Sequence, residues 1–212
     1  MNSIIIGAGT YGEVYLSYLR ESGINVVGFI DDNIATHHTQ IHGIPVLGGR
    51  EILRSAAQTH NIEAVYCPIG NNRVRVELLT LARELGYQTP NYIHPSAIVS
   101  ADAKLGQGVY ILPGSIVMPY TTIGDYTMVS MGVKIAHHSQ LERGVFLSTG
   151  CNFGASIIAK EYAYCGISST IMTGVKQIGC DSLIGAGAVV IRDVPDRAVV
   201  AGVPAKILKY KE

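Results

Sequence analysis

A large apolar residue returns at every sixth position from Ile93 to Phe153, eleven positions in succession. The series continues to Ile171, shifts by one residue, and resumes at Ile178 to end at Val190. A period of six fits neither a 3.6-residue helix nor an alternating strand. It is typical of a β-solenoid built from hexapeptide repeats, in which each side of a triangular coil uses six residues and each coil packs only on its neighbours. With eighteen residues to a coil, the segment from Ile93 to Val190 holds between five and six coils.

The residues before the repeat have the pattern of a small α/β unit. The segment Gly7-Ala8-Gly9-Thr10-Tyr11-Gly12 is a G-x-G-x-x-G motif between an apolar strand, Ser3–Ile6, and a helix predicted over Glu13–Glu21. A second predicted strand, Asn25–Ile30, ends in Asp31-Asp32, where Rossmann-type proteins keep the acid that binds ribose. The further elements that we expect are a helix over Arg50–Thr59, a strand over Ala64–Cys67, a helix over Arg73–Leu85 and a strand near Thr89–Ile93.

About 90 residues precede the first hexad, which is too few for the two mononucleotide-binding halves of a full dinucleotide fold. The glycine loop therefore suits a mononucleotide or its diphosphate better than NAD. A glycine turn kept only for packing a strand against a helix remains an alternative. We expect a Rossmann-like domain over residues 1–90 and a solenoid domain over residues 91–212.

Composition excludes several classes of partner. Lys and Arg together number 16, as do Asp and Glu, so the chain has no electrostatic footprint for nucleic acid or an anionic membrane. No apolar run approaches the length of a membrane span, and the first residues are too quickly broken by glycine for a signal peptide. The four cysteines form no C-x-x-C pair, which disfavours a zinc site and indicates reduced packing residues in a cytoplasmic protein.

The combination of Gly7–Gly12, Asp31-Asp32, Gly43–Gly48 and Gly70–Arg73 with hexapeptide repeats resembles the bacterial hexapeptide-repeat sugar acetyltransferases of the PglD and NeuD type. The resemblance covers essentially the whole chain. It implies a left-handed parallel β-helix that forms a homotrimer, with acetyl-CoA in a groove between subunits. It also implies acetyl transfer to the amino group of a nucleotide-linked amino sugar in surface-glycan biosynthesis. Two alternatives stay open: O-acetylation of a sugar hydroxyl, as in the sialic acid enzymes, and a scaffold that binds a sugar nucleotide without catalysis.

The resemblance also assigns binding residues. Tyr11 stands where the family usually has histidine, so we expect the sugar or phosphate to be contacted differently there, or a different sugar to be used. Residues 193–195 and 201–206 resemble the segment that closes these solenoids. The implied contacts to the nucleotide-linked sugar are Gly9, Thr10, Tyr11, Asp31, Asp32 and Gly70, and those to acetyl-CoA are Phe146, Ala155, Ile167, Ala186 and Lys206.

His137 and His138 are the candidate catalytic residues, because they lie inside the repeat whereas most of the other five histidines lie in polar segments. Acetyl transfer needs a base to take a proton from the nucleophile, and neutral imidazole serves near pH 7. One coil of eighteen residues after His137 lies Ala155, whose amide we expect beside the imidazole as a donor to the tetrahedral intermediate. The resemblance likewise implies that His137 is the base.

Two positions depart from the family pattern. His138 stands where the amino-sugar enzymes have a glutamate that orients the catalytic ring, and Phe146 replaces a second family histidine. Orientation then falls to Glu142, to Glu161, to a backbone carbonyl or to His138 itself. A metal enzyme is not expected, since the carbonic-anhydrase-like members of the fold need three histidines and none follows His138.

Overall fold

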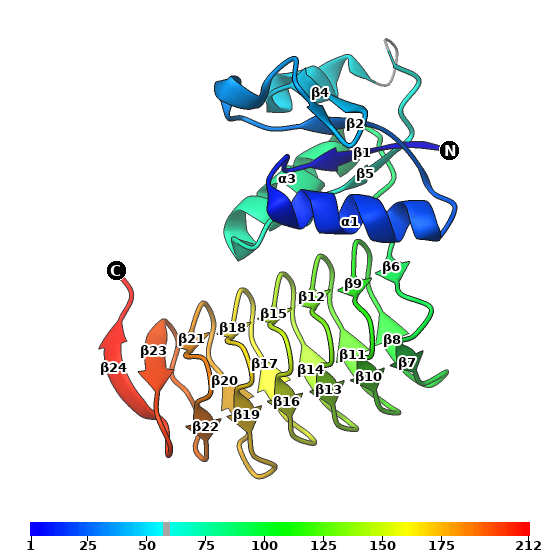
Figure 1. The fold of residues 1–212 in the computed structure, drawn as a ribbon. Coiled ribbons are helices and arrows are strands. Elements are labelled where there is room, and N and C mark those ends of the chain that lie inside the picture. Colours follow the sequence, from blue (N-terminus) through cyan, green and yellow to red (C-terminus); the bar gives the residue numbers. More distant parts are fainter. Residues whose placement is uncertain (57–59) are drawn as a thin grey trace. The chain divides into compact units, whose positions relative to one another are not determined.

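The structure is a computed structural model that describes residues 1–56 and 60–212. The chain divides into two compact units, Met1–Pro90 and Asn91–Glu212. The first contains an open sheet with helices, and the second consists of stacked coils (Figure 1).

The sheet of the first unit has the strand order β3-β4-β2-β1-β5. All its pairs are parallel except β3 with β4. Strand β1 lies inside the sheet between β2 and β5, and its isoleucines are buried, as expected for a parallel strand covered on both faces. The strands are β1 (Asn2–Ile6), β2 (Asn25–Ile30), β3 (Gln40–Ile41), β4 (Ile44–Gly48) and β5 (Ala64–Tyr66), and the helices include α1 (Thr10–Glu21), α3 (Asn72–Glu84) and the 3-10 helices η1 (Ile34–Thr36) and η2 (Arg50–Arg54).

The elements expected in this unit are found, with differences in where one helix begins and in the type of another. Helix α1 begins at Thr10, directly after the glycine loop, so it starts three residues earlier than predicted. Within the helix predicted over Arg50–Thr59, Arg50–Arg54 form a 3-10 helix, η2, Ser55 is a turn, and Ala56 is helical again. Residues 57–59 of that prediction lie outside the described residues.

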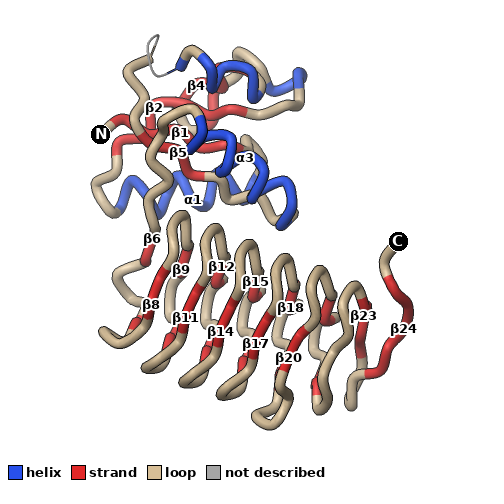
Figure 2. Tube along the Cα trace, turned by 180° about the vertical axis from the view of Figure 1, so that it is seen from behind, coloured by secondary structure: helices blue, strands red, loops and turns tan. Residues whose placement is uncertain are grey.

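The second unit is a three-sided parallel β-helix in which each face is a sheet of two-residue strands from successive coils (Figures 1 and 2). Face 1 contains β6 (Tyr92–Ile93), β9 (Tyr110–Ile111), β12 (Met128–Val129), β15 (Phe146–Leu147), β18 (Tyr164–Cys165) and β21 (Leu183–Ile184). Face 2 contains β7 (Ile98–Val99), β10 (Ile116–Val117), β13 (Lys134–Ile135), β16 (Asn152–Phe153), β19 (Thr170–Ile171) and β22 (Val189–Val190). Face 3 contains β8 (Lys104–Leu105), β11 (Thr122–Ile123), β14 (Gln140–Leu141), β17 (Ile158–Ala159) and β20 (Gln177–Ile178).

The register between coils is the one that the six-residue period predicts. Lys134 pairs with Ile116 on one side and Asn152 on the other, eighteen residues away in each direction. The second residue of each strand points into the interior of the β-helix, and from Ile111 onward these residues form one continuous buried core. Thr170 pairs with Val189, nineteen residues on, so the one-residue shift in the repeat is present in the fold.

The shift is absorbed at a corner, the turn between two faces. Thr173 and Val175 form an isolated bridge around Gly174, whose φ of 106° is in the region that favours glycine. Pairing resumes at Gln177, so the extra residue disturbs no strand.

Small hydroxyl residues at the corners fasten each coil to the next. The Thr121 hydroxyl donates to the Ala136 carbonyl (3.3 Å), and the Ser139 hydroxyl donates to the Gly154 carbonyl (2.9 Å). Ser115 and Thr127 make the same bond to carbonyls fifteen residues further on. A buried carbonyl that lacks a hydrogen-bond partner destabilises the folded state. Each of these hydroxyls therefore restricts the orientation of the peptide whose carbonyl accepts from it.

The C-terminal segment closes the end of the solenoid, as the resemblance implied. Strand β23 (Ala198–Ala201) pairs in parallel with β21, and β24 (Lys206–Tyr210) returns antiparallel to it. Val194, Ala198 and Val200 join the buried core. None of the helices among the described residues is long and apolar enough to cross a bilayer.

None of the four cysteines, all of which lie among the described residues, forms a disulfide. Cys67, Cys151 and Cys165 are buried, and Cys180 is half-buried. Burial raises the pKa of the Cys67 thiol to about 12, so this thiol stays protonated at neutral pH.

From the sequence, Met118, Tyr120, Met128, Met131 and Phe146 are expected on the outer faces of the solenoid as apolar surface for assembly to bury, and this set needs a correction. Met118, Tyr120 and Met131 are exposed, but Met128 and Phe146 on face 1 are only 1% and 7% exposed. These side chains lie in one row: Met128 pairs in register with Phe146, whose ring meets that of Tyr164 edge-on.

Candidate active site

The glycine loop joins β1 to α1 by a close approach of two backbone segments. A Cβ on Gly12 would lie 2.0 Å from the carbonyl oxygen of Gly7, so only glycine fits there. A Cβ on Gly9 would meet nothing within 4 Å, and Gly9 and Thr10 are exposed at the start of the helix. The motif therefore combines a packing glycine with an open position at a helix N-terminus, where backbone N–H groups favour an anion.

Asp31 fastens this loop to the end of β2. One carboxylate oxygen accepts from the Ala8 amide (2.7 Å) and the other from the Asn33 amide (2.8 Å). An imidazole nitrogen of His37 lies 2.7 Å from the Asp31 carbonyl oxygen. Asp31 thus holds the shape of the loop, a role that sequence reasoning did not assign.

Asp32, the neighbouring acid, is held by Arg50, the first residue of the 3-10 helix η2 that follows β4. The Arg50 amide donates to one carboxylate oxygen (2.9 Å), and its Nε donates to the other (2.7 Å). The Arg50 side-chain hydrogen bond lowers the pKa of Asp32, so this exposed acid is ionised at neutral pH. Arg50 also donates to Glu77 of α3 (2.8 Å).

The remaining predicted sugar-nucleotide contacts lie at the same edge of the sheet, since the carboxyl ends of the parallel strands β1, β2 and β5 meet there. Gly70 is exposed in the turn that leads to α3, and the Asn71 side chain caps that helix by accepting from Arg73 and Val74. Tyr11 is half-buried, and its ring lies edge-on to Tyr15 (5.3 Å between centroids).

His137 and His138 occupy the corner between faces 2 and 3, immediately after β13. Both are exposed, and their Nδ1 atoms lie 3.0 Å apart. The ring of His138 also lies against Tyr120 of the preceding coil (4.9 Å between centroids). On the other side, the His137 carbonyl accepts from the Ser156 amide of the following coil (3.0 Å).

Ala155 is at the equivalent corner position one coil after His137, and Thr173 is at that position one coil later again. The Ala155 amide donates to the Thr173 hydroxyl (3.1 Å), and therefore points to the following coil. Stepping eighteen residues from Ala155 would have found Thr173. The role of the Ala155 amide stays a prediction, but its partner in this structure is a hydroxyl.

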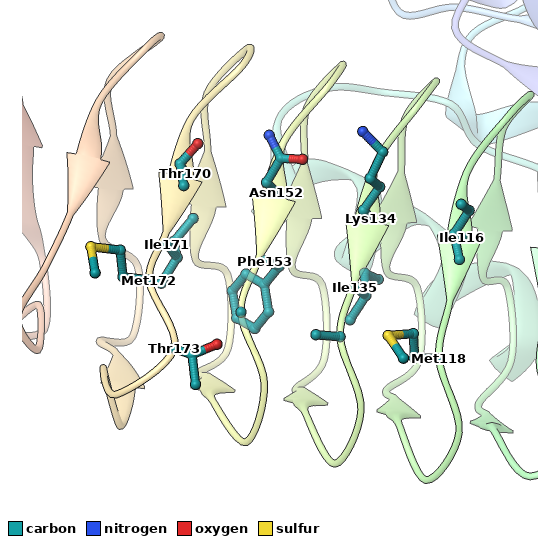
Figure 3. A pocket seen from close by; sticks show the side chains of 12 residues that line it. Ile116, Met118, Lys134, Ile135, Asn152, Phe153, Thr170, Ile171, Met172 and Thr173 are labelled. Atoms are coloured by element: carbon teal, nitrogen blue, oxygen red, sulfur yellow. The ribbon is translucent and has the colours of Figure 1, made fainter.

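A hollow of about 410 Å³ lies on face 2 and ends at this corner. Lys134, Asn152 and Thr170 form one row on neighbouring strands, with Met118 and Met172 at the flanks (Figure 3). The hollow is also lined by Ala136, Gly154 and Thr173. Ala136 precedes His137 and Gly154 precedes Ala155 in the chain, and the Thr173 hydroxyl accepts from the Ala155 amide. A mostly apolar hollow thus borders the histidine pair.

The positions predicted to contact acetyl-CoA are distributed over different parts of the solenoid. Ile167 and Ala186 are exposed on successive coils at the corner between faces 1 and 2, whereas Ala155 is at the corner between faces 2 and 3. Phe146 is buried on face 1. Lys206 is exposed on β24 and lines a separate hollow of about 280 Å³ together with Arg192. Within one chain, face 2 therefore separates Ile167 and Ala186 at one of its edges from Ala155 at the other.

Comparison with known proteins gives matches over both units. Residues 2–81 match the model of the PglD N-terminal domain family. A variant of perosamine N-acetyltransferase from Caulobacter crescentus, solved with CoA and GDP-perosamine, has a similar structure, with a TM-score of 0.92 and 32% identity over 99% of this chain and 97% of that one. The acetyltransferase domain of PglB from Neisseria gonorrhoeae has a TM-score of 0.89 and 28% identity, over 98% of this chain and 99% of that one.

Curated relatives match the repeat region in part. Serine acetyltransferase 2 from Arabidopsis thaliana is 32% identical over 120 residues, which cover 57% of this chain and 32% of that protein. Galactoside O-acetyltransferase from Escherichia coli is 32% identical over 102 residues, 45% of this chain and 47% of that protein. The chain thus spans a third to a half of the length of these curated relatives.

The two glycines of the loop should respond differently to an added methyl group. Gly12→Ala should lower the free energy of unfolding by about 1–3 kcal/mol, because the new Cβ collides with the Gly7 carbonyl. Gly9→Ala, at an open N-cap position with φ of −85°, should lower it by less than about 1 kcal/mol, because alanine is only a poorer N-cap than glycine and meets no neighbouring atom. Denaturant unfolding of both variants measures this difference, and equal destabilisation would contradict the assigned packing role.

Proposed function

Because this chain belongs to the hexapeptide-repeat sugar acetyltransferases with a PglD-type N-terminal domain, we propose that it transfers the acetyl group of acetyl-CoA to the amino group of a nucleotide-linked amino sugar. The observation that carries the proposal is the histidine pair at the corner bordering the hollow of face 2. The similarity to perosamine N-acetyltransferase over nearly the full length of both chains supports it.

In the proposed reaction His137 is the general base. The neutral amine attacks the thioester carbonyl carbon and forms the C–N bond, while Nε2 of His137 takes the proton that the amine loses. Collapse of the tetrahedral intermediate breaks the C–S bond. The CoA thiolate then leaves and takes the proton back from the imidazolium. No step needs a metal.

The Ala155 amide is the proposed donor to the oxyanion of that intermediate. In the structure this N–H is bonded to the Thr173 hydroxyl, so the thioester oxygen has to displace that hydroxyl by a side-chain rotation. The bond between the Ser139 hydroxyl and the Gly154 carbonyl restrains the peptide preceding Ala155 during this exchange. A preorganised donor of this kind contributes to the rate because it needs no reorganisation when charge develops.

The N-terminal unit is the proposed site for the nucleotide-linked sugar. The exposed start of α1 at Gly9 and Thr10 offers amide donors to a diphosphate, and the ionised Asp32 offers acceptor oxygens to a base or ribose. Tyr11 and Gly70 border the same edge of the sheet and complete the proposed contacts. Asp31 supports the glycine loop by accepting from the Ala8 amide.

Acetyl-CoA would bind in a groove shared by two subunits of a homotrimer. The exposed corner residues Ile167 and Ala186 would contact it from one subunit, and Ala155 from its neighbour. The exposed apolar residues along face 2, among them Met118 and Met172, would be covered by assembly. Lys206 is the proposed partner of a CoA phosphate, and Phe146 would contribute only through packing, since its ring is buried. Acetyl-CoA and nucleotide sugars are cytoplasmic metabolites, so we place the reaction in the cytoplasm.

Removing the proposed base should abolish most turnover. His137→Ala should lower kcat by roughly 10²–10⁴-fold, because this is the usual contribution of general-base catalysis. The measurement is the rate of CoA release with GDP- and UDP-linked amino sugars. The same sugars with a hydroxyl group in place of the amine test for O-acetylation. His60→Ala, an exposed histidine of the other unit, is the control and should keep full activity. Full activity of His137→Ala would refute the proposed function of this site.

Loss of the acid held by Arg50 should weaken binding of the acceptor alone. Asp32→Ala should raise the acceptor KM by about tenfold, as for one lost charge-assisted hydrogen bond, and leave the acetyl-CoA KM nearly unchanged. Asp102→Ala, an exposed acid of the solenoid, is the matched control. An equal rise in both KM values would mean that the N-terminal unit is not the sugar-nucleotide site.

Assembly should be visible in solution. Sedimentation at micromolar concentration should give three times the chain mass of 22.7 kDa, because face 2 presents Met118, Met172 and Ile191 with 41%, 49% and 43% of their surface exposed. Met118→Glu together with Met172→Glu should shift the protein toward monomer. A wild-type monomer with full turnover would contradict the shared groove.

A further inference from the structure

The contact between the two histidine rings sets which nitrogen of His137 is basic. Their Nδ1 atoms are 3.0 Å apart, which is a hydrogen-bond distance. A neutral imidazole carries one ring proton, so a hydrogen bond here needs the proton on one of the two Nδ1 atoms and a lone pair on the other. Two arrangements satisfy the contact: either His137 or His138 donates from Nδ1. The ring that donates has its free lone pair on Nε2, and the ring that accepts carries its proton there.

Only one arrangement makes His137 a base. If His138 donates, the proton of His137 sits on its Nε2 and that nitrogen cannot accept another. If His137 donates from Nδ1, its Nε2 holds the free lone pair and the proton of His138 sits on the far nitrogen of that ring. General-base chemistry at His137 therefore needs His138 as the acceptor.

The surroundings of His138 suit a supporting residue rather than the base itself. Its ring lies against Tyr120 of the preceding coil, at 4.9 Å and 47° between the ring planes. Its amide donates to the Pro119 carbonyl of the same coil (3.2 Å). The Ala155 amide, which would receive the oxyanion, is on the following coil, adjacent to His137. Contacts with the preceding coil thus restrain His138, whereas the backbone of His137 is bonded to the following coil, which carries Ala155.

The backbone at His138 fixes the direction of the side chain. Its φ is 59°, in the left-handed region that asparagine, aspartate and histidine tolerate better than other residues. The Thr121 hydroxyl holds the peptide just before His137 through the Ala136 carbonyl. The two rings are therefore presented from a restrained corner.

We propose that His138 is a positioning residue that accepts the Nδ1 proton of His137 and thereby keeps Nε2 of His137 free to take the proton of the acceptor substrate. This inference rests on the proposed function of His137. When His137 gains the substrate proton it becomes an imidazolium, and its Nδ1–H continues to donate to His138. No proton passes to His138, and the hydrogen bond strengthens because its donor is now charged.

The test compares two substitutions that differ in acceptor capacity. His138→Asn tolerates the positive φ and can place its amide oxygen where Nδ1 was, so it should keep kcat within about threefold of wild type. His138→Ala has no acceptor and should lower kcat by roughly tenfold to a hundredfold, the range for a lost hydrogen bond to a charged group, with the acetyl-CoA KM unchanged. Thermal unfolding of both variants controls for loss of fold. Equal activity of the two variants, whether high or low, would overturn the proposal.

A spectroscopic readout tests the tautomer directly. In protein labelled with ¹⁵N in the histidine rings, the His137 signals, identified by their loss in His137→Ala, should show a protonated Nδ1 and an unprotonated Nε2 at neutral pH. His138→Asn should preserve this pattern, and His138→Ala should lose it. A protonated Nε2 in the wild-type protein would overturn the proposal. If His137→Ala is inactive while His138→Ala is fully active, the positioning role fails and the proposed function stands.

Discussion

The hydrogen bonds between successive coils are the interaction on which the rest of the solenoid depends. Each two-residue strand is too short to be stable alone, so its place is fixed by the strands eighteen residues before and after it. This register stacks the inward aliphatic residues into one core and stacks corner residues into columns. The column of His137, Ala155 and Thr173 is a direct result. The left-handed β-helix thus places the proposed base, the proposed amide donor and a hydroxyl on consecutive coils without any long-range loop.

A close backbone approach has the corresponding role in the N-terminal unit. Gly12 lets α1 pack against the carbonyl of Gly7, and Asp31 ties the loop to the end of β2. The position left open, Gly9, is the one at which a ligand can approach the helix start. In both units the packing residues are fixed by contacts with backbone, whereas Gly9 of the loop and the histidine pair His137 and His138 are exposed.

Periodicity made much of this predictable. The six-residue spacing predicted the register between coils. A step of eighteen residues placed Ala155 on the following coil, at the position equivalent to His137. The same step would have found Thr173 after Ala155 and Tyr120 before His138, because stacked positions follow from length alone. The contact between the two Nδ1 atoms was not predictable, since it depends on side-chain rotamers. The pairing of Arg50 with Asp32 joins the start of η2 to the end of β2, and the burial of Met128 and Phe146 depends on three-dimensional packing, so neither follows from spacing.

The extra residue at the corner around Gly174 shows where this architecture accepts variation. A residue inserted within a face would turn every following side chain to the wrong side of its strand. At the corner, the insertion leaves the strands before and after it in register and the core continuous. In this chain the faces keep one length, whereas this corner takes up an extra residue. Thr173, whose hydroxyl meets the Ala155 amide, lies at the same corner, so the group that occupies the proposed oxyanion donor sits where the coil can be lengthened without disturbing the scaffold.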